Sequence, residues 1–158
     1  MSKILLNQNV FSEMFNKIPA KLSGNWIKQN SSYEVGLCKE IGWIPDENRY
    51  FDARYKELNI EIKKGKSIWL DLVRYSEITL GIGCQNTITA FFIPSKDKIF
   101  IDKILFVMTD KIIETLKIDI SLANALIKLN SRMPRSLNCQ ASLTVHDLSK
   151  IAFCTKTF

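Results

Sequence analysis

The chain contains few of the residues that build metal–thiolate sites. Its 158 residues include one histidine and four cysteines. The cysteines, Cys38, Cys84, Cys139 and Cys154, share no C-x-x-C spacing, and His146 lies beside none of them. This pattern argues against a zinc site, and we expect reduced, mostly buried thiols instead.

Long hydrophobic runs are also missing. No apolar run approaches the roughly 20 residues that a helix needs to cross a bilayer. Residues 1–7 carry only a three-residue apolar patch, which does not predict a signal peptide. We therefore expect a cytoplasmic protein without a membrane partner. Because there are no internal repeats and 46% of the residues are hydrophobic, the sequence predicts one globular domain over residues 1–158.

The charge balance is moderately basic. The net charge is +6, from 22 Lys and Arg against 16 Asp and Glu. This excess suits a polyanionic partner such as a nucleic acid. Many proteins without such a partner are equally basic, so the charge alone does not choose between the two readings.

Hydrophobic periodicity predicts a mixture of helices and strands. Helices are expected over 3–18, 31–42, 67–78, 110–117 and 119–130; strands over 50–53, 58–63, 87–94, 99–108 and around 143–145; and a turn over 43–48. The expected caps are Ser31 or Ser32, Gly42, Ser67 and Thr109. Val35 and Trp69 are expected to pack inward from their helices. This order predicts an α/β (α+β) fold, a mixed central β-sheet flanked by helices.

The segment Leu58–Lys63 carries the clearest chemical signal. Apolar and polar residues alternate along it, so Glu61 and Lys63 project from one face of a strand, roughly 6.5–7 Å apart. Asp52 lies nine residues before Glu61 and follows the apolar pair Tyr50-Phe51. Two acids and a base gathered in this way can hold a divalent metal and a water, which is the chemistry of phosphodiester hydrolysis.

This pattern resembles the PD-(D/E)xK nuclease superfamily, with Asp52, Glu61 and Lys63 at its three signature positions. The order of elements and the chain length resemble PvuII-like type II restriction endonucleases, over roughly Tyr33 to Leu116. The resemblance implies a restriction-endonuclease-like fold and a homodimer that cuts double-stranded DNA with Mg²⁺. Other nucleases of the superfamily, which act in repair or on junctions, and a non-catalytic basic DNA-binding protein are the alternatives.

The resemblance also implies a role for each residue of the motif. Asp52 and Glu61 would bind the metal, and the carbonyl of Ile62 would complete its coordination. Lys63 would orient or deprotonate the attacking water and stabilise charge at the phosphate. Magnesium does prefer such oxygen ligands, and a lysine ammonium acts as a point charge. The sequence leaves open whether Lys63 is a base or an electrostatic stabiliser.

The first acid of the motif has a competitor. The family often shows Pro-Asp, which occurs here as Pro45-Asp46, whereas Asp52 follows Phe51. We prefer Asp52 because Tyr50 and Phe51 would place it on a strand against the core, while Asp46 lies in a polar turn. Further acids near the metal are expected, on the resemblance, at Glu47 and at Glu34 or Glu40, each with a solvated surface as its alternative.

Several polar residues are candidates for DNA contacts. Arg49 and Arg54 flank Asp52 and should lie near the cleaved backbone, and Lys64 and Lys66 extend the basic run. Further candidates are Arg132 and Arg135 for phosphates, Asn138, Gln140 and the segment 85–87 for bases, and His146 for either. Ordinary solvated loops are the alternative. We expect dimer contacts within residues 1–30, a catalytic core over 31–110, and helices with a DNA-contacting tail over 111–158.

Overall fold

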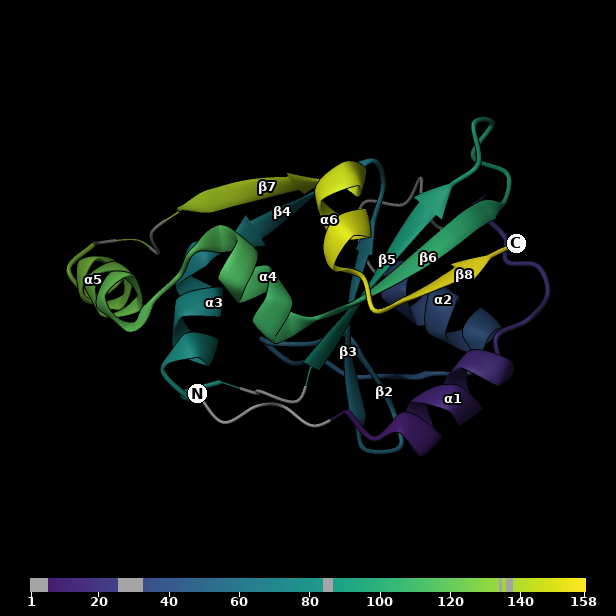
Figure 1. The fold of residues 1–158 in the computed structure, drawn as a ribbon, viewed down its shortest axis with the longest axis horizontal. Coiled ribbons are helices and arrows are strands. Elements are labelled where there is room, and N and C mark those ends of the chain that lie inside the picture. Colours follow the sequence, from purple (N-terminus) through teal and green to yellow (C-terminus); the bar gives the residue numbers. More distant parts are fainter. Residues whose placement is uncertain (1–5, 26–32, 84–86, 134, 136–137) are drawn as a thin grey trace.

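A six-stranded sheet forms the centre of the molecule in the computed structural model, which describes residues 6–25, 33–83, 87–133, 135 and 138–158 (Figure 1). The strand order is β1-β2-β3-β5-β6-β8. The strands are β1 (Ile44–Pro45), β2 (Ala53–Tyr55), β3 (Leu58–Lys64), β5 (Thr87–Pro94), β6 (Ile101–Met108) and β8 (Cys154–Thr157). Only the β3–β5 pair is parallel, so the predicted mixed sheet is confirmed.

Helices cover both faces of this sheet. They are α1 (Gln8–Asn16), α2 (Tyr33–Ile41), α3 (Leu72–Thr79), α4 (Thr109–Leu116), α5 (Ile120–Ser131) and α6 (Val145–Ile151). Helices α1 and α2 pack on one face, and α3 to α6 contribute to the apolar cluster on the other. The predicted helix-flanked sheet is therefore confirmed. No helix within the described ranges is long and apolar enough to cross a membrane.

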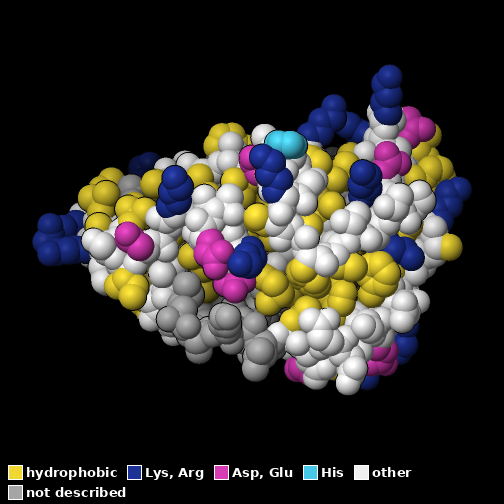
Figure 2. All heavy atoms as spheres, in the orientation of Figure 1, with side chains coloured by type: hydrophobic (Ala, Val, Ile, Leu, Met, Phe, Trp, Pro, Cys, Tyr) yellow, Lys and Arg dark blue, Asp and Glu magenta, His cyan; other side chains and the backbone are white. Residues whose placement is uncertain are grey.

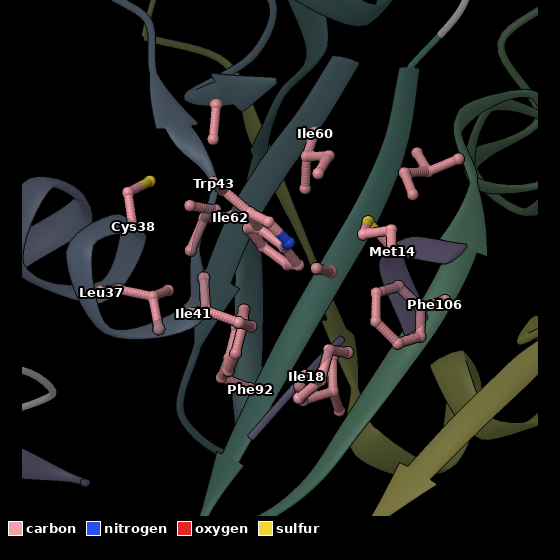
Figure 3. Close-up of a cluster of buried hydrophobic side chains, with 14 of the residues drawn as sticks. Met14, Ile18, Leu37, Cys38, Ile41, Trp43, Ile60, Ile62, Phe92 and Phe106 are labelled. Carbon is pink, nitrogen blue, oxygen red and sulfur yellow. The ribbon is translucent and has the colours of Figure 1, made fainter. Parts of the chain in front are cut away.

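Two apolar clusters sandwich the sheet because successive strand residues point to opposite faces. The first cluster, shown in Figure 3, joins Met14 of α1 and Leu37 of α2 to Ile60 and Ile62 of β3. The second cluster includes Tyr75 of α3 and Phe91 of β5 on the opposite face. Strand β3 contributes no side chain to this second cluster. Its residues on that face are polar, and they form the candidate site described below.

A separate two-stranded antiparallel sheet lies over the second cluster. It pairs β4 (Ser67–Asp71) with β7 (Gln140–Thr144), and we call it the β4–β7 ribbon. Ile68, Leu70 and Leu143 of this ribbon are buried in the second cluster. Figure 1 shows the ribbon next to α6 on one side of the main sheet.

The ribbon corrects the prediction of a helix over 67–78. The first five of these residues form β4, and α3 begins at Leu72 with Asp71, not Ser67, as its N-cap. Burial alternates with a period of two along β4, and pairing with β7 satisfies its backbone, so tertiary contacts override local helix preference. Trp69 points outward and is 61% exposed. Its predicted role as a packing residue is therefore wrong.

Smaller differences concern the element ends. Helix α2 confirms the helix over 31–42, and Gly42 ends it with φ of +85°, but Val35 is 56% exposed and not part of the apolar side. Thr109 is the first residue of α4 and not its cap. The turn over 43–48 contains the short strand β1. Ser31, Ser32, Trp26, Cys84 and residues 85–86 lie outside the described residues.

The described cysteines follow the expected chemistry. Cys38, Cys139 and Cys154 are free thiols. Cys38 is fully buried in the first cluster, and the other two are half-buried. Burial raises the pKa of Cys38 to about 12, so this thiol stays protonated and inert at neutral pH.

Candidate active site

Strand β3 places Glu61 and Lys63 together on one face of the sheet. Leu58, Ile60 and Ile62 point into the first cluster, so the alternating positions face the side of α3. Glu61 is only 5% exposed. Lys63 Nζ lies 3.2 Å from Glu61 Oε1. The predicted same-face pair is therefore present as a direct ion pair.

Asp52 reaches this face from the neighbouring hairpin. It lies just before β2, and its backbone amide donates to the carbonyl of Ile60 at 2.9 Å. Its Oδ2 atom accepts a hydrogen bond from the backbone amide of Ile62 at 2.7 Å. The Asp52 carboxyl is thereby held beside Ile62, the residue between Glu61 and Lys63, and it shares a hydrogen bond with the Glu61 carboxyl.

The electrostatics of the two carboxyls follow from their burial. Desolvation raises the pKa of Glu61 to about 7, and the neighbouring Asp52 adds to this shift, while Lys63 and Arg74 oppose it. Desolvation also raises the pKa of Asp52, against the hydrogen bond from Ile62. Two adjacent carboxyls with little exposure resist double ionisation, and Lys63 and Arg74 offset this only in part. Glu61 therefore keeps its proton to a higher pH than a free glutamate does.

Arg74 is a site residue that the sequence reasoning missed. It comes from α3, and its guanidinium lies 3.4 Å from Glu61 Oε1. Its Nε atom is buried and makes no hydrogen bond within the described part of the chain. The nearest available signal was Asp71, a good N-cap residue three positions before Arg74, which could have placed the start of α3 correctly.

The peptide groups of Ile62 make two side-chain hydrogen bonds. Its amide donates to Asp52, and its carbonyl accepts from the Tyr33 hydroxyl at 3.5 Å. Lys64 Nζ lies 3.8 Å from the centre of the Tyr33 ring. Because Lys64 follows Lys63 on the strand, it points to the opposite face, toward α2. Its ammonium is thus separated from the carboxyl pair.

A pocket of about 460 Å³ opens beside Asp52. It is lined by Glu34, Val35, Pro45, Asp46, Glu47, Asn48 and Asp52. The negative charge of Glu34 raises the pKa of Asp52. Glu40 does not line this pocket, and its carboxylate accepts from the backbone amide of Ser23 at 2.6 Å. Of the two helix acids that were left open, Glu34 is the one beside the carboxyl pair.

The structure separates the two competing aspartates. Asp46 Oδ2 forms an ion pair with Arg54 Nε at 2.8 Å. The backbones of the two aspartates are linked, since the Asp46 amide donates to the Asp52 carbonyl at 2.9 Å. Of the two carboxyls, that of Asp52 shares a hydrogen bond with Glu61.

The predicted DNA-contacting residues differ in their surroundings. Arg49 and Arg54 each have an acidic partner: Arg49 binds Glu77 at 2.8 and 3.1 Å, and Arg54 binds Asp46. Lys64 faces α2, and Thr87 of the segment 85–87 is buried, which argues against a base contact there. The remaining described candidates are exposed: Lys66, Arg132, Arg135, Asn138, Gln140 and His146. His146 stands in the first turn of α6.

The donor set fits a hard divalent cation. Among the described residues, no group of three or more His, Cys, Asp or Glu could hold a metal ion. A site of two carboxylates and one backbone carbonyl needs only two such residues, and Mg²⁺ usually keeps several waters. The adjoining carboxyls of Asp52, which is half-buried, and Glu61, which is buried, provide such a donor set together with the Ile62 carbonyl.

Comparisons with models of protein families, with curated proteins and with solved structures found no match for this chain.

Proposed function

We propose that the protein is a Mg²⁺-dependent endonuclease that hydrolyses phosphodiester bonds in double-stranded DNA. The observation that carries this proposal is the contact of the half-buried Asp52 carboxyl with the buried Glu61 carboxyl, with Lys63 paired to Glu61. The element order α2, β1, β2, β3, β4, α3, β5 supports it, because a helix, a hairpin and the E-x-K strand follow one another as in the resemblance to the PD-(D/E)xK superfamily. Within that superfamily we propose a PvuII-like type II restriction endonuclease.

Each side chain has a role in this reaction. Asp52, Glu61 and the Ile62 carbonyl would hold Mg²⁺, which when bound lowers the pKa of a water and offsets phosphate charge. Lys63 contributes a positive charge at the edge of the carboxyl pair, where a scissile phosphate would lie. Arg74 is fixed by α3 on the same carboxylate. Its charge adds to that of Lys63 beside the carboxyl pair.

The balance of charges favours a phosphate at this position. Two ionised carboxylates beside Lys63 and Arg74 are neutral as a group, so the site gains charge when a divalent cation enters. The resulting positive group attracts a phosphodiester. Because Glu61 is buried, these interactions act in a medium where they are stronger than in water.

A digestion of phage DNA tests the proposal. The wild-type protein should produce discrete fragments with Mg²⁺ and none after chelation with EDTA. Discrete fragments indicate a specific short site. A smear, or preferential cutting of nicked or four-way DNA, would assign the protein to a repair or junction nuclease instead. Intact DNA that is nevertheless bound without metal would indicate a non-catalytic DNA-binding protein.

Matched variants separate site effects from general effects. Asp52→Asn and Lys63→Ala should abolish the Mg²⁺-dependent fragments. Asp102→Asn and Lys103→Ala, which alter exposed residues of β6, should leave them unchanged. Cleavage that survives both site substitutions would refute the proposal.

The homodimer is part of the proposal. Two subunits related by a two-fold axis would each cut one strand of a palindromic site. In the described part of residues 1–30, Phe11 and Met14 of α1 are buried in the protein's own first cluster. A molar mass of one chain, measured by light scattering on active enzyme bound to DNA, would contradict the dimer.

A further inference from the structure

The outer face of the β4–β7 ribbon has an unusual composition. Directly opposed residues of an antiparallel pair share a face, and the pairs here are Ser67 with Thr144, Trp69 with Ser142, and Asp71 with Gln140. Trp69 is therefore surrounded by small or polar side chains. It is 61% exposed, whereas tryptophan is usually among the more buried residues. An exposed tryptophan in the middle of a regular ribbon is typical of a contact surface.

The ribbon is directly connected to the candidate site. Strand β3 carries Glu61 and Lys63, and β4 follows it after the turn Gly65-Lys66. The other end of β4 leads into α3, whose Arg74 contacts Glu61. Glu61, Lys63 and the ribbon also lie on the same side of the main sheet, the side of the second cluster. The ribbon and the candidate site therefore share one side of the molecule.

The charges around the outer face favour a polyanion. Lys66 precedes β4, His146 and Lys150 belong to α6 after β7, and Arg132 and Arg135 precede β7 in the chain. All five are exposed. Figure 2 shows Lys and Arg side chains along the part of the surface where α6 lies. This excess of cations is the charge complement of a nucleic acid.

The acids nearest the ribbon are occupied by local structure. Asp71 Oδ1 accepts from the backbone amides of Val73 and Arg74 as the cap of α3. Asp147 accepts from the amide and hydroxyl of Thr144 in the capping box of α6. Both carboxylates keep their negative charge, but two acids offset only part of the charge of the four flanking Lys and Arg side chains.

We infer that the outer face of the β4–β7 ribbon binds duplex DNA, with Trp69 as its central apolar contact to a base or sugar. This inference rests on the proposed function, since it takes the DNA as the substrate that the carboxyl pair cuts. A two-stranded ribbon fits the major groove of B-DNA. The indole supplies stacking or apolar contact, and the flanking cations supply the sequence-independent attraction to phosphates.

Binding of a labelled 30-base-pair random duplex, measured by fluorescence anisotropy in EDTA, tests this surface without cleavage. Trp69→Ala should weaken binding about tenfold, and Trp69→Phe should weaken it less. The slope of log affinity against log salt should stay unchanged in Trp69→Ala, because an indole releases no counterions. Lys66→Ala should reduce that slope by about one. Phe100→Ala, at an exposed aromatic residue before β6, serves as the control and should bind as the wild type does.

The binding measurements have four outcomes that would overturn the inference. These are wild-type affinity in Trp69→Ala, equal losses in Trp69→Ala and Phe100→Ala, an altered salt slope in Trp69→Ala, and no wild-type binding at all. A DNA-free mass that is twice as large in the wild type as in Trp69→Ala would assign the face to a second copy, which also overturns it. Binding through Trp69 without Mg²⁺-dependent cleavage would preserve this inference and remove the proposed function. Mg²⁺-dependent cleavage that is unchanged in Trp69→Ala would preserve the proposed function and remove this inference.

Discussion

The backbone amide of Ile62 donates a 2.7 Å hydrogen bond to Asp52 Oδ2. This bond connects the acid before β2 to the middle of the E-x-K strand, so the hairpin fixes the position of the Asp52 carboxyl relative to Glu61. The two residues that flank Ile62 are Glu61 and Lys63, and both point to the face on which Asp52 lies. The motif is thus assembled by one β-hairpin, before any ligand enters.

The choice between the two aspartates leads to the first prediction. Asp52→Ala should lower the Mg²⁺-dependent cleavage rate at least about a hundredfold, because the metal supplies several kcal/mol of charge stabilisation and each 1.36 kcal/mol is tenfold in rate. Asp46→Ala should lose only its partly exposed ion pair with Arg54, which is worth about 1 kcal/mol or less. Single-turnover rates on a cleaved plasmid would compare them. A larger loss of cleavage rate in Asp46→Ala than in Asp52→Ala would indicate that Asp46 is the metal ligand.

The burial of Glu61 leads to a pH prediction. Its pKa is about 7 in the folded protein against 4.5 ordinarily, so between these values the folded chain retains a proton that the unfolded chain has lost. The contribution of Glu61 to the free energy of unfolding is therefore fully present below pH 4.5. It is lost as the pH rises toward 7, which lowers the free energy of unfolding by on the order of 3 kcal/mol. Asp52, whose pKa is also raised, adds a loss of the same sign.

Urea unfolding at pH 5 and pH 8 in EDTA measures this slope. Glu61→Gln should flatten the difference between the two pH values, because the amide does not titrate. Mg²⁺ should restore stability at pH 8 in the wild type if it binds the ionised pair. An identical pH slope in the wild type and Glu61→Gln would show that Glu61 is not the responsible group.

Arg74 gives the third prediction. Arg74→Ala removes a cation from Glu61 and a positive charge from beside the expected phosphate position, so single-turnover cleavage should fall by about a hundredfold. Arg74→Lys should recover part of the rate, because it restores the charge without the planar donor set. Equal rates for the wild type and Arg74→Ala would limit Arg74 to holding Glu61 in place.

Two glycines give a matched stability prediction. A Cβ at Gly24 would lie 2.6 Å from the backbone oxygen of Lys98, so Gly24→Ala must displace backbone and should cost about 1–3 kcal/mol. A Cβ at Gly36, within α2, would meet nothing within 4 Å. Gly36→Ala should therefore stabilise the protein by about 0.5–1 kcal/mol. Thermal unfolding of the two variants should shift in opposite directions, and a shared direction would contradict this packing.

The sequence predicted those features that depend on local pattern. The alternation over Leu58–Lys63 placed Glu61 and Lys63 on one face, and the apolar runs located β5 and β6, as the structure confirms. The contact between Asp52 and Glu61 follows from the close succession of the two predicted strands, although β2 begins at Ala53, just after Asp52. These features need only the period of a strand and a short turn.

Features that depend on distant partners were not predictable. Ser67–Asp71 pairs with β7 about 70 residues away in the chain, and no local signal reports that pairing, so the segment looked helical and Trp69 looked buried. The same error concealed Arg74, since its place in the first turn of α3 depends on where β4 ends. Val35 was misplaced because helical spacing alone does not show how far α2 lies over the sheet.

Isothermal calorimetry with Mg²⁺ tests the central claim most directly. At pH 6 the wild type should release protons when it binds Mg²⁺, because the ion displaces the proton held by the Asp52 and Glu61 carboxyls. The measured binding heat should therefore change with the ionisation enthalpy of the buffer. Asp52→Asn and Glu61→Gln should each lose this binding, and Asp102→Asn should retain it. Equal Mg²⁺ binding by the wild type and both site variants would show that the carboxyl pair holds no cation.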